Sequence, residues 1–260
     1  MNSADGFWID SHIHLDCLGS PPAVAAAVRA AAGAGVGAFV VPGIDPEHWP
    51  GLLATVRRVP GALAAPGVHP QAATCWNAAT AAALEVLLAT AGVVAIGEIG
   101  LDAFVNSPPA AQEEAFRGQL RLAIAAGLPL LIHCRRASGR LLRILDEEDA
   151  RRVGGIFHAF SGSVETAMEA IQRGFAIGFG GTVTWPEARR APQVLQALPA
   201  EWIVVETDAP DLPPHPYRDS ANRPDLLPHI GATVAALRGW GLAETRNITS
   251  ANVRRVLQLK

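Results

Sequence analysis

The sequence predicts an α/β fold, a closed (β/α)8 TIM barrel that forms a single domain over residues 1–260. Apolar runs of strand length alternate with amphipathic helical stretches from end to end, which is typical of a parallel sheet with crossover helices. The 260 residues match the roughly 250 that such a barrel needs, and no Pro/Gly/Ser-rich linker or charge block divides them. An open doubly wound sheet is the alternative that this pattern leaves open.

Eight apolar runs are the expected strands. Each is apolar on both sides, as a strand buried between the barrel interior and a layer of helices must be. In chain order the runs are Phe7–Leu15, Val36–Ile44, Ala62–Pro70, Val93–Asp102, Pro129–Arg135, Gly154–Ser161, Phe175–Val183 and Ile203–Pro210. Between them, apolar residues at helical spacing predict helices over Ala78–Ala91 and Gln112–Ala126. The proline-rich segment Pro210–Pro224 is expected to form a long loop on the catalytic face.

The composition favours a soluble protein of a reducing compartment. No apolar run approaches the roughly 20 residues of a membrane span, and Met1–Asp10 lacks the features of a signal peptide. The three cysteines show no CxxC spacing, so a disulfide framework is not expected. We therefore expect a cytoplasmic protein without membrane association or an obligate protein partner. A net charge of −3 gives no overall attraction to nucleic acid, so a polyanionic substrate would have to be bound locally by arginine and metal.

Histidines and carboxylates end five of the predicted strands. In a strand, alternate residues point to the same side, so His12 and His14 are expected to face one point together. The carboxyl ends of barrel strands meet at one face, where active sites are built. Burying so many such groups together without a cation would cost several kcal/mol, which predicts a metal centre. The six candidate ligands are His12, His14, Glu98, His133, His158 and Asp208.

The chemistry of these six side chains suggests the kind of metal. Imidazole and carboxylate without thiolate suit Zn²⁺, Mn²⁺, Ni²⁺ or Mg²⁺. Six ligands exceed the roughly three that one catalytic zinc takes, so two divalent ions bridged by a carboxylate are expected. Because Lys260 is the only lysine, a carboxylated-lysine bridge and Schiff-base chemistry are both excluded. Glu98, flanked by Gly97 and Gly100, is the best candidate for the bridge.

Several segments resemble the TatD family of metal-dependent deoxyribonucleases, within the amidohydrolase superfamily, and the resemblance covers nearly the whole chain. The matching segments are Asp10-Ser11-His12-Ile13-His14-Leu15, Gly67-Val68-His69-Pro70, Gly97-Glu98-Ile99-Gly100-Leu101-Asp102, Leu128-Pro129-Leu130-Leu131-Ile132-His133, His158-Ala159-Phe160-Ser161-Gly162 and Glu206-Thr207-Asp208-Ala209-Pro210. The resemblance implies that the six candidates are the metal ligands, with Glu98 as the bridge. It also implies that His69 and Arg135 bind the substrate phosphate and that Glu206 acts beside Asp208.

Simpler explanations remain open for two of these residues, and two segments depart from the family pattern. On a strand Glu206 would share a face with Asp208, which leaves a supporting role open, and His69 before Pro70 could be a turn residue. Ala103-Phe104 replaces the usual aromatic pair, and Asn222-Arg223-Pro224 replaces the common Asn-Glu-Pro. The predicted metal ligands match the family, whereas these two segments, which are expected near the substrate, differ from the family pattern.

The hypothesis for the mechanism is hydrolysis by a metal-activated water. Two ions lower the pKa of a shared water, Asp208 accepts its proton with Glu98 and Glu206 as the other catalytic carboxylates, and Arg135 stabilises the charge on the phosphoryl oxygens. The expected substrate is single-stranded DNA, or RNA, degraded from an end. The aromatic candidates for base stacking are Trp76, Phe104, Trp185 and Tyr217.

Two other classes of function are weighed against this one. The same metals and water could hydrolyse a carbon ester, lactone or amide, and Arg223 with the proline-rich loop leaves that alternative open. A binding module that only retains the barrel is disfavoured because no candidate ligand is missing.

Overall fold

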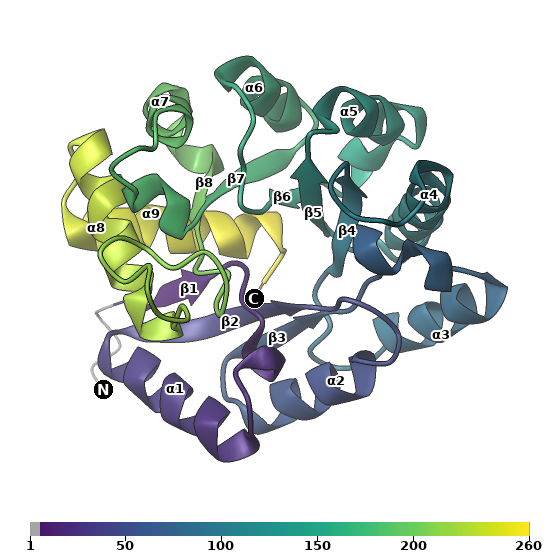
Figure 1. Ribbon diagram of the computed structural model, residues 1–260, viewed down its shortest axis with the longest axis horizontal. Helices are drawn as coiled ribbons and strands as arrows, with labels where there is room; N and C mark the ends of the chain where they lie inside the picture. Colours follow the sequence, from purple (N-terminus) through teal and green to yellow (C-terminus); the bar gives the residue numbers. More distant parts are fainter. Residues whose placement is uncertain (1–5, 260) are drawn as a thin grey trace.

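Eight parallel strands form a closed ring, with helices around its outside, in the computed structural model, which describes residues 6–259 (Figure 1). The parts of the predictions that concern residues 1–5 and Lys260 lie outside this range. The strands are β1 Trp8–Asp10, β2 Val36–Pro42, β3 Ala62–Ala65, β4 Ile96–Asp102, β5 Leu130–Arg135, β6 Gly155–Phe157, β7 Phe175–Phe179 and β8 Ile203–Val205. The α-helices in the described range are α1 Pro21–Gly33, α2 Trp49–Arg58, α3 Ala78–Leu88, α4 Pro109–Ala126, α5 Ser138–Glu147, α6 Val164–Gln172, α7 Arg190–Ala197, α8 Leu227–Arg238 and α9 Leu242–Val256.

The ring closes at two seams between regular ladders. Strands β1 to β3 pair in parallel, as do β4 to β8. Between β3 and β4 the amide of Val94 donates to the carbonyl of Ala64 over 2.9 Å. Between β8 and β1 the amide of Ser11 donates to the carbonyl of Val205 over 3.2 Å. The (β/α)8 barrel predicted from the sequence is confirmed, and the open sheet is excluded.

Several strands are shorter than the apolar runs that predict them, and β1 and β8 are two of these. Where both strands end, the carboxylate of Asp10 replaces the hydrogen bonds between strands. It accepts from the amide of Thr207 at 2.9 Å and from the amide of His12 at 3.3 Å. The expectation that His12 and His14 lie on the strand was therefore wrong, because both follow its end. They nevertheless reach the carboxyl-end face of the ring.

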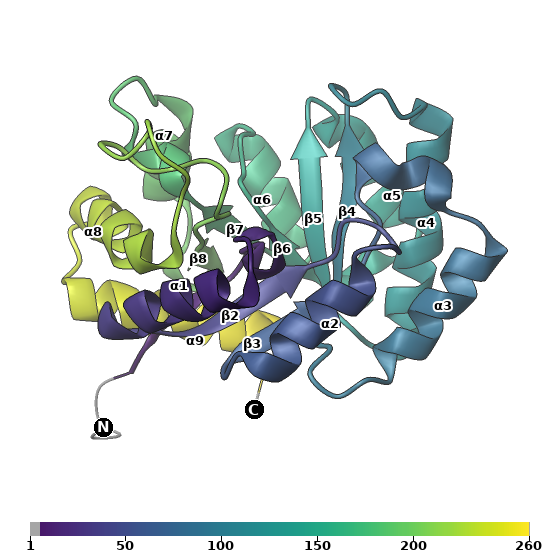
Figure 2. The same ribbon diagram turned by 60° about the horizontal axis from the view of Figure 1, so that its bottom comes forward.

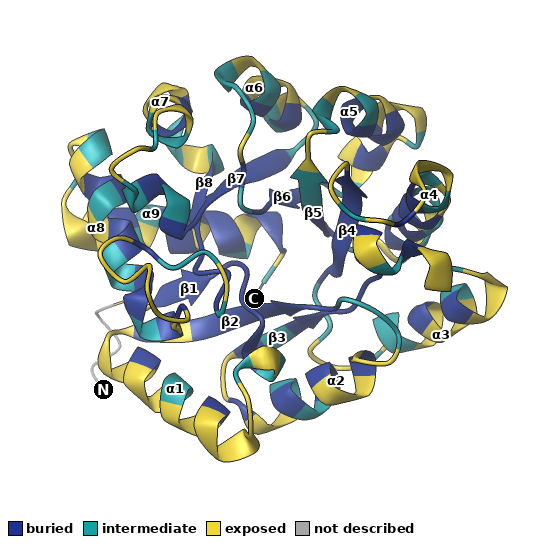
Figure 3. Cartoon of the chain, viewed as in Figure 1, coloured by how far each residue is buried: buried dark blue, intermediate teal, exposed yellow. Residues whose placement is uncertain are grey.

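Apolar side chains fill the inside of the ring and the space between ring and helices. A compact group inside the barrel includes Ile9, Val40, Leu131, Ile156 and Val204, each from a different strand. Residues near the end of α9 pack against the same group, so this helix covers the amino-terminal end of the barrel. The surrounding helices turn buried faces to the ring and exposed faces to solvent (Figure 3).

The segment from residue 206 to 223 contains no helix or strand, as predicted for the proline-rich stretch. Its path is fixed by Asn222, whose side-chain amide donates to the carbonyls of Thr207 at 2.6 Å and Asp211 at 2.8 Å. The loop rises beside the carboxyl ends of the strands (Figure 2). In residues 6–259, none of the helices has the length and apolarity to cross a bilayer.

Candidate metal centre

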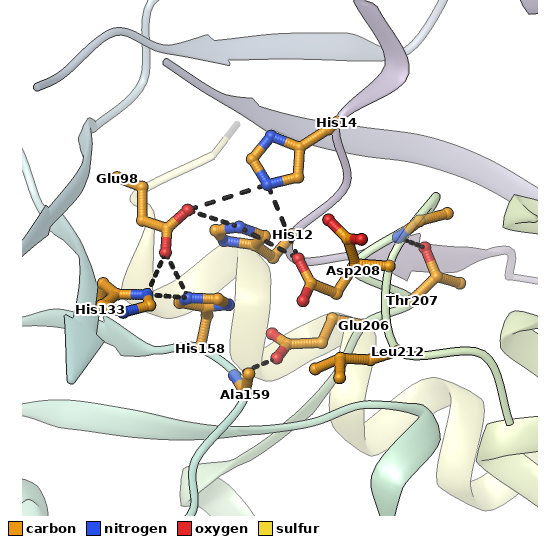
Figure 4. Close-up of polar contacts among 12 residues, drawn as sticks. His12, His14, Glu98, His133, His158, Ala159, Glu206, Thr207, Asp208 and Leu212 are labelled. Atoms are coloured by element: carbon orange, nitrogen blue, oxygen red, sulfur yellow. Dashed lines mark hydrogen bonds and ion pairs between the residues drawn. The ribbon is translucent and has the colours of Figure 1, made fainter. Parts of the chain in front are cut away.

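The six candidate ligands, spread over nearly 200 residues of sequence, lie together at the carboxyl-end face of the barrel (Figure 4). Their positions follow from the strand ends. Two of them follow β1, one each lies in β4 and β5, one follows β6 and one follows β8. All are buried except His133, which is partly exposed. In that order they are His12, His14, Glu98, His133, His158 and Asp208.

The two oxygens of the Glu98 carboxylate face two separate groups of imidazoles. Oε2 lies 3.4 Å from Nε2 of His12 and 3.8 Å from Nε2 of His14. Oε1 lies 2.6 Å from Nδ1 of His133 and 2.5 Å from Nε2 of His158. Glu98 thus occupies the middle of the cluster, with one oxygen for each side.

The atoms around Oε2 of Glu98 lie slightly farther apart than ligands that share one cation. Oδ1 of Asp208 lies 3.6 Å from Nε2 of both His12 and His14. These separations exceed the usual hydrogen-bond length, but two ligand atoms that share one ion at about 2.1 Å lie roughly 3.0 to 3.4 Å apart. Neither ring nitrogen of the fully buried His12 has a hydrogen-bond partner among the described residues. A divalent cation beside Oε2 of Glu98 would provide a partner for Nε2 of His12, so the residues fit a metal.

Burial and mutual charge set the protonation of the cluster. Burial lowers the pKa of His12 and His14, which keeps both imidazoles neutral, as metal ligands must be. Burial raises the pKa of Asp208 well above its usual range. Burial also acts to raise the pKa of Glu98, but the surrounding imidazoles, His158 above all, outweigh burial and hold the pKa of Glu98 well below its usual value. The Glu98 carboxylate in turn outweighs the effect of burial on His158 and raises the pKa of His158 to about 10.

His69 is a turn residue, one of the explanations that the sequence left open, and it also lies beside the cluster. It caps the turn Pro70–Cys75, since its Nδ1 accepts from the amide of Gln71 at 3.1 Å. Its Nε2 lies 3.6 Å from Oε1 of Glu98, and its ring contacts His133 edge to face at 4.4 Å. Burial lowers the pKa of His69 to about 4, so the imidazole is neutral near pH 7.

Glu206 lies beneath the cluster and is fully buried. One carboxylate oxygen accepts from the amide of Ala159 at 2.5 Å and the other from the hydroxyl of Ser11 at 3.2 Å. The expectation that Glu206 and Asp208 share a strand face was wrong: both follow β8, and Asp208 has a left-handed backbone with φ of 60°. The contacts of Glu206 connect the segments after β1, β6 and β8, which is a supporting position.

Asp102 is a functional candidate that the sequence analysis named only as part of a motif. Its Oδ2 lies 2.8 Å from Nε2 of His133, the nitrogen opposite the one that faces Glu98. A carboxylate in this position fixes the orientation of an imidazole ligand and increases its basicity. The signal was present in the sequence, because Glu98, Gly100 and Asp102 alternate along β4 and therefore share one face.

A cavity of about 790 Å³ opens above the cluster. Carboxylates lie on its floor, and the exposed Arg135 lies on its wall, with its guanidinium carbon 4.9 Å from the ring centroid of Phe104. Of the aromatic candidates, Trp185 lines the cavity, whereas Trp76 packs against the core and over Gly118. The hollow thus offers space, positive charge and aromatic surface directly over the candidate ligands.

A parallel barrel with a buried histidine–carboxylate cluster at the carboxyl ends of its strands is the arrangement of a metal-dependent hydrolase. Comparison with known proteins supports this class. A family model described as TatD related DNase matches residues 9–258, and the chain belongs to that family. The resemblance stated from the sequence motifs is thereby confirmed.

Individual relatives match over almost their whole length. A protein of Cronobacter sakazakii named 3'-5' ssDNA/RNA exonuclease TatD is 40% identical over 88% of this chain and 89% of its own. The uncharacterized metal-dependent hydrolase YabD of Bacillus subtilis is 34% identical over 96% of this chain and 98% of its own. The crystal structure of the TatD homologue YjjV from Escherichia coli superposes with a TM-score of 0.90, at 34% identity, over 97% of this chain and 98% of its own.

Proposed function

We propose that this hydrolase uses two divalent ions to remove nucleotides from an end of single-stranded DNA or RNA. The observation that supports it best is the position of Glu98, whose two oxygens face two separate ligand groups. The Cronobacter relative, 40% identical, is named as an exonuclease of single-stranded DNA and RNA. The cavity with Arg135 on its wall can accept a phosphodiester above the cluster.

The proposed ligands divide into two sets that share Glu98. His12, His14 and Asp208 would hold one ion, and His133 and His158 the other. Ions bound there supply a water of lowered pKa and stabilise the charge of a phosphoryl group. The donor set suits Zn²⁺, Mn²⁺, Ni²⁺ or Mg²⁺, and metal analysis of the purified protein will identify which is present.

The protein side chains contribute orientation and proton transfer. Asp208 accepts the proton of the attacking water, a role that its buried carboxylate beside His12 and His14 is placed to perform. Asp102 holds His133 in place through the nitrogen that points away from Glu98. Neutral His69 and cationic Arg135 face the space above the cluster and bind the phosphate.

The test is hydrolysis of a 5'-labelled single-stranded oligomer by protein of known metal content, with and without a chelator. We expect stepwise shortening from one end that stops with chelator and returns when metal is added. The Asp208→Asn variant should stay folded and lose activity. Hydrolysis of a lactone, ester or amide panel with no shortening of the oligomer would replace this proposal by the carbon-ester alternative.

A further inference from the structure

Two arginines, Arg189 and Arg190, line the cavity besides Arg135. They follow β7, whereas Arg135 ends β5. Arg189 and Arg190 lie at the start of helix α7, after the 3-10 turn that follows β7, and both are exposed. Arg190 donates to the carbonyl of Ser161 at 3.3 Å, which directs it toward the segment after β6. No carboxylate of residues 6–259 lies within 4.0 Å of either guanidinium. Both charges are therefore available to an anion in the cavity.

The stability of helix α7 does not explain these two charges. Arg189 is the N-cap residue and Arg190 the first residue of the helix, which has no acidic residue in its first turn. Positive side chains at a helix amino terminus oppose the helix dipole and are unfavourable there. A bound phosphate would reverse this, because it would interact favourably with both guanidinium groups.

Charge in the cavity is divided between floor and wall. Glu98, Asp102 and Asp208 are buried and form the deep part of the lining, whereas Arg135, Arg189 and Arg190 are exposed and line it nearer the solvent. A phosphate at the floor is close to the end of β5 and so to Arg135, which lies 3.9 Å from Asp102. Arg189 and Arg190 enter from the loop after β7, with β6 between (Figure 1). Arg189 and Arg190 are therefore placed to bind another phosphate of the nucleic-acid chain than the one beside Arg135.

We infer that Arg189 and Arg190 form a second phosphate subsite, which binds the phosphodiester next to the one being cleaved. This inference rests on the proposed function and specifies its substrate: chains with at least two phosphodiesters are preferred over those with one. The cavity of about 790 Å³ is in the upper part of the roughly 300–1,000 Å³ range of ligand sites, which suits more than one unit of a chain. The second site increases affinity for the strand and leaves the chemistry at the floor unchanged.

The test compares thymidine substrates that differ by one phosphodiester. The dinucleoside monophosphate contains only the scissile phosphate, and the trinucleoside diphosphate adds one more. For the natural chain we expect kcat/KM to be about tenfold higher on the longer substrate, mostly through KM. In the double variant Arg189→Ala/Arg190→Ala this advantage should disappear, while kcat/KM on the dinucleoside monophosphate stays within about twofold.

A second measurement follows binding of a labelled thymidine tetramer to the Asp208→Asn background by fluorescence anisotropy at increasing salt. Removing one phosphate contact should reduce the slope of log K against log salt by about 0.7. Arg189→Lys/Arg190→Lys keeps the charge and should retain most of the slope. The control is Arg57→Ala/Arg58→Ala, which removes two other exposed charges at the end of α2, outside the cavity.

The outcomes separate this inference from the proposed function. The subsite is overturned if Arg189→Ala/Arg190→Ala hydrolyses both substrates and still prefers the longer one as the natural chain does. It is also overturned if the control variant loses this preference equally. Neither result contradicts the proposed nuclease activity. No hydrolysis of either substrate, together with no shortening of the 5'-labelled oligomer, overturns the nuclease, and the salt slope then decides whether the arginines bind a polyanion. An unchanged slope in Arg189→Ala/Arg190→Ala rejects the subsite in either case.

Discussion

Replacing Gly178 by alanine should destabilise the protein through the buried carboxylate of Glu206. A Cβ added at Gly178, in the middle of β7, would lie 2.8 Å from Cδ and 2.9 Å from Oε1 of Glu206. The carboxylate cannot move without disturbing its hydrogen bonds from the amide of Ala159 and the hydroxyl of Ser11. Each hydrogen bond to a charged group contributes about 1.5–3 kcal/mol. Disturbing one or both should lower the free energy of unfolding by about 2–5 kcal/mol.

The measurement is urea denaturation of metal-free protein at pH 7, followed by circular dichroism. Gly139→Ala is the matched control: it lies in α5, where an added Cβ meets nothing within 4 Å, and should stabilise by about 0.5–1 kcal/mol. In a Glu206→Ala background the Gly178→Ala change should have little further effect, because the clashing carboxylate is gone. A loss below about 1 kcal/mol for Gly178→Ala, or the same loss in both backgrounds, would refute the reasoning.

Three further predictions concern the cluster itself. Asp102→Asn should weaken metal binding about 10–100-fold, because His133 loses the carboxylate that orients it; competition with a chromogenic chelator measures this, and an unchanged affinity would contradict it. Glu98→Gln should reduce the metal content from the proposed two ions per chain to one or none, because a neutral amide bridges poorly; elemental analysis decides, and a metal content equal to that of the natural chain would exclude a bridging role. In the metal-free protein the pKa of His69 is lowered from 6.5 to about 4, so folding favours its neutral form: the stabilisation is complete above pH 6.5, is lost as the pH falls toward 4 and is absent below. The difference in unfolding free energy between the natural chain and His69→Gln should therefore shrink by about 3 kcal/mol from pH 7 to pH 4, and a constant difference would show that His69 titrates normally.

The strand order and the barrel could be predicted because buried parallel strands are apolar along their whole length. The ends of β1 and β8 could not, since apolar residues continue past the last ladder bond. There the side chain of Asp10 accepts from the amide and hydroxyl of Thr207, nearly 200 residues away. A contact between two remote segments has no local signal, so the predicted runs were too long.

The convergence of the six candidate ligands was predictable for a related reason: each follows or ends a strand, and all strand ends meet at one face. Their partners were harder to see. Asp102 lies two residues after Gly100 and four after Glu98 in β4, so its side chain is on the same face of the strand as Glu98, and this could have been derived from the sequence. The surroundings of Glu206, by contrast, combine Ser11 with Ala159, and no spacing in the sequence indicates that these residues meet.

The closing seam of the barrel makes the cluster depend on two segments that are far apart in the sequence. The hydrogen bond between the amide of Ser11 and the carbonyl of Val205 joins β1 to β8. It holds the segment with His12 and His14 beside the segment with Asp208, whose Oδ1 lies 3.6 Å from Nε2 of both histidines. Opening of this one seam would therefore separate the two histidines from their carboxylate neighbour while the other strand pairs stay intact.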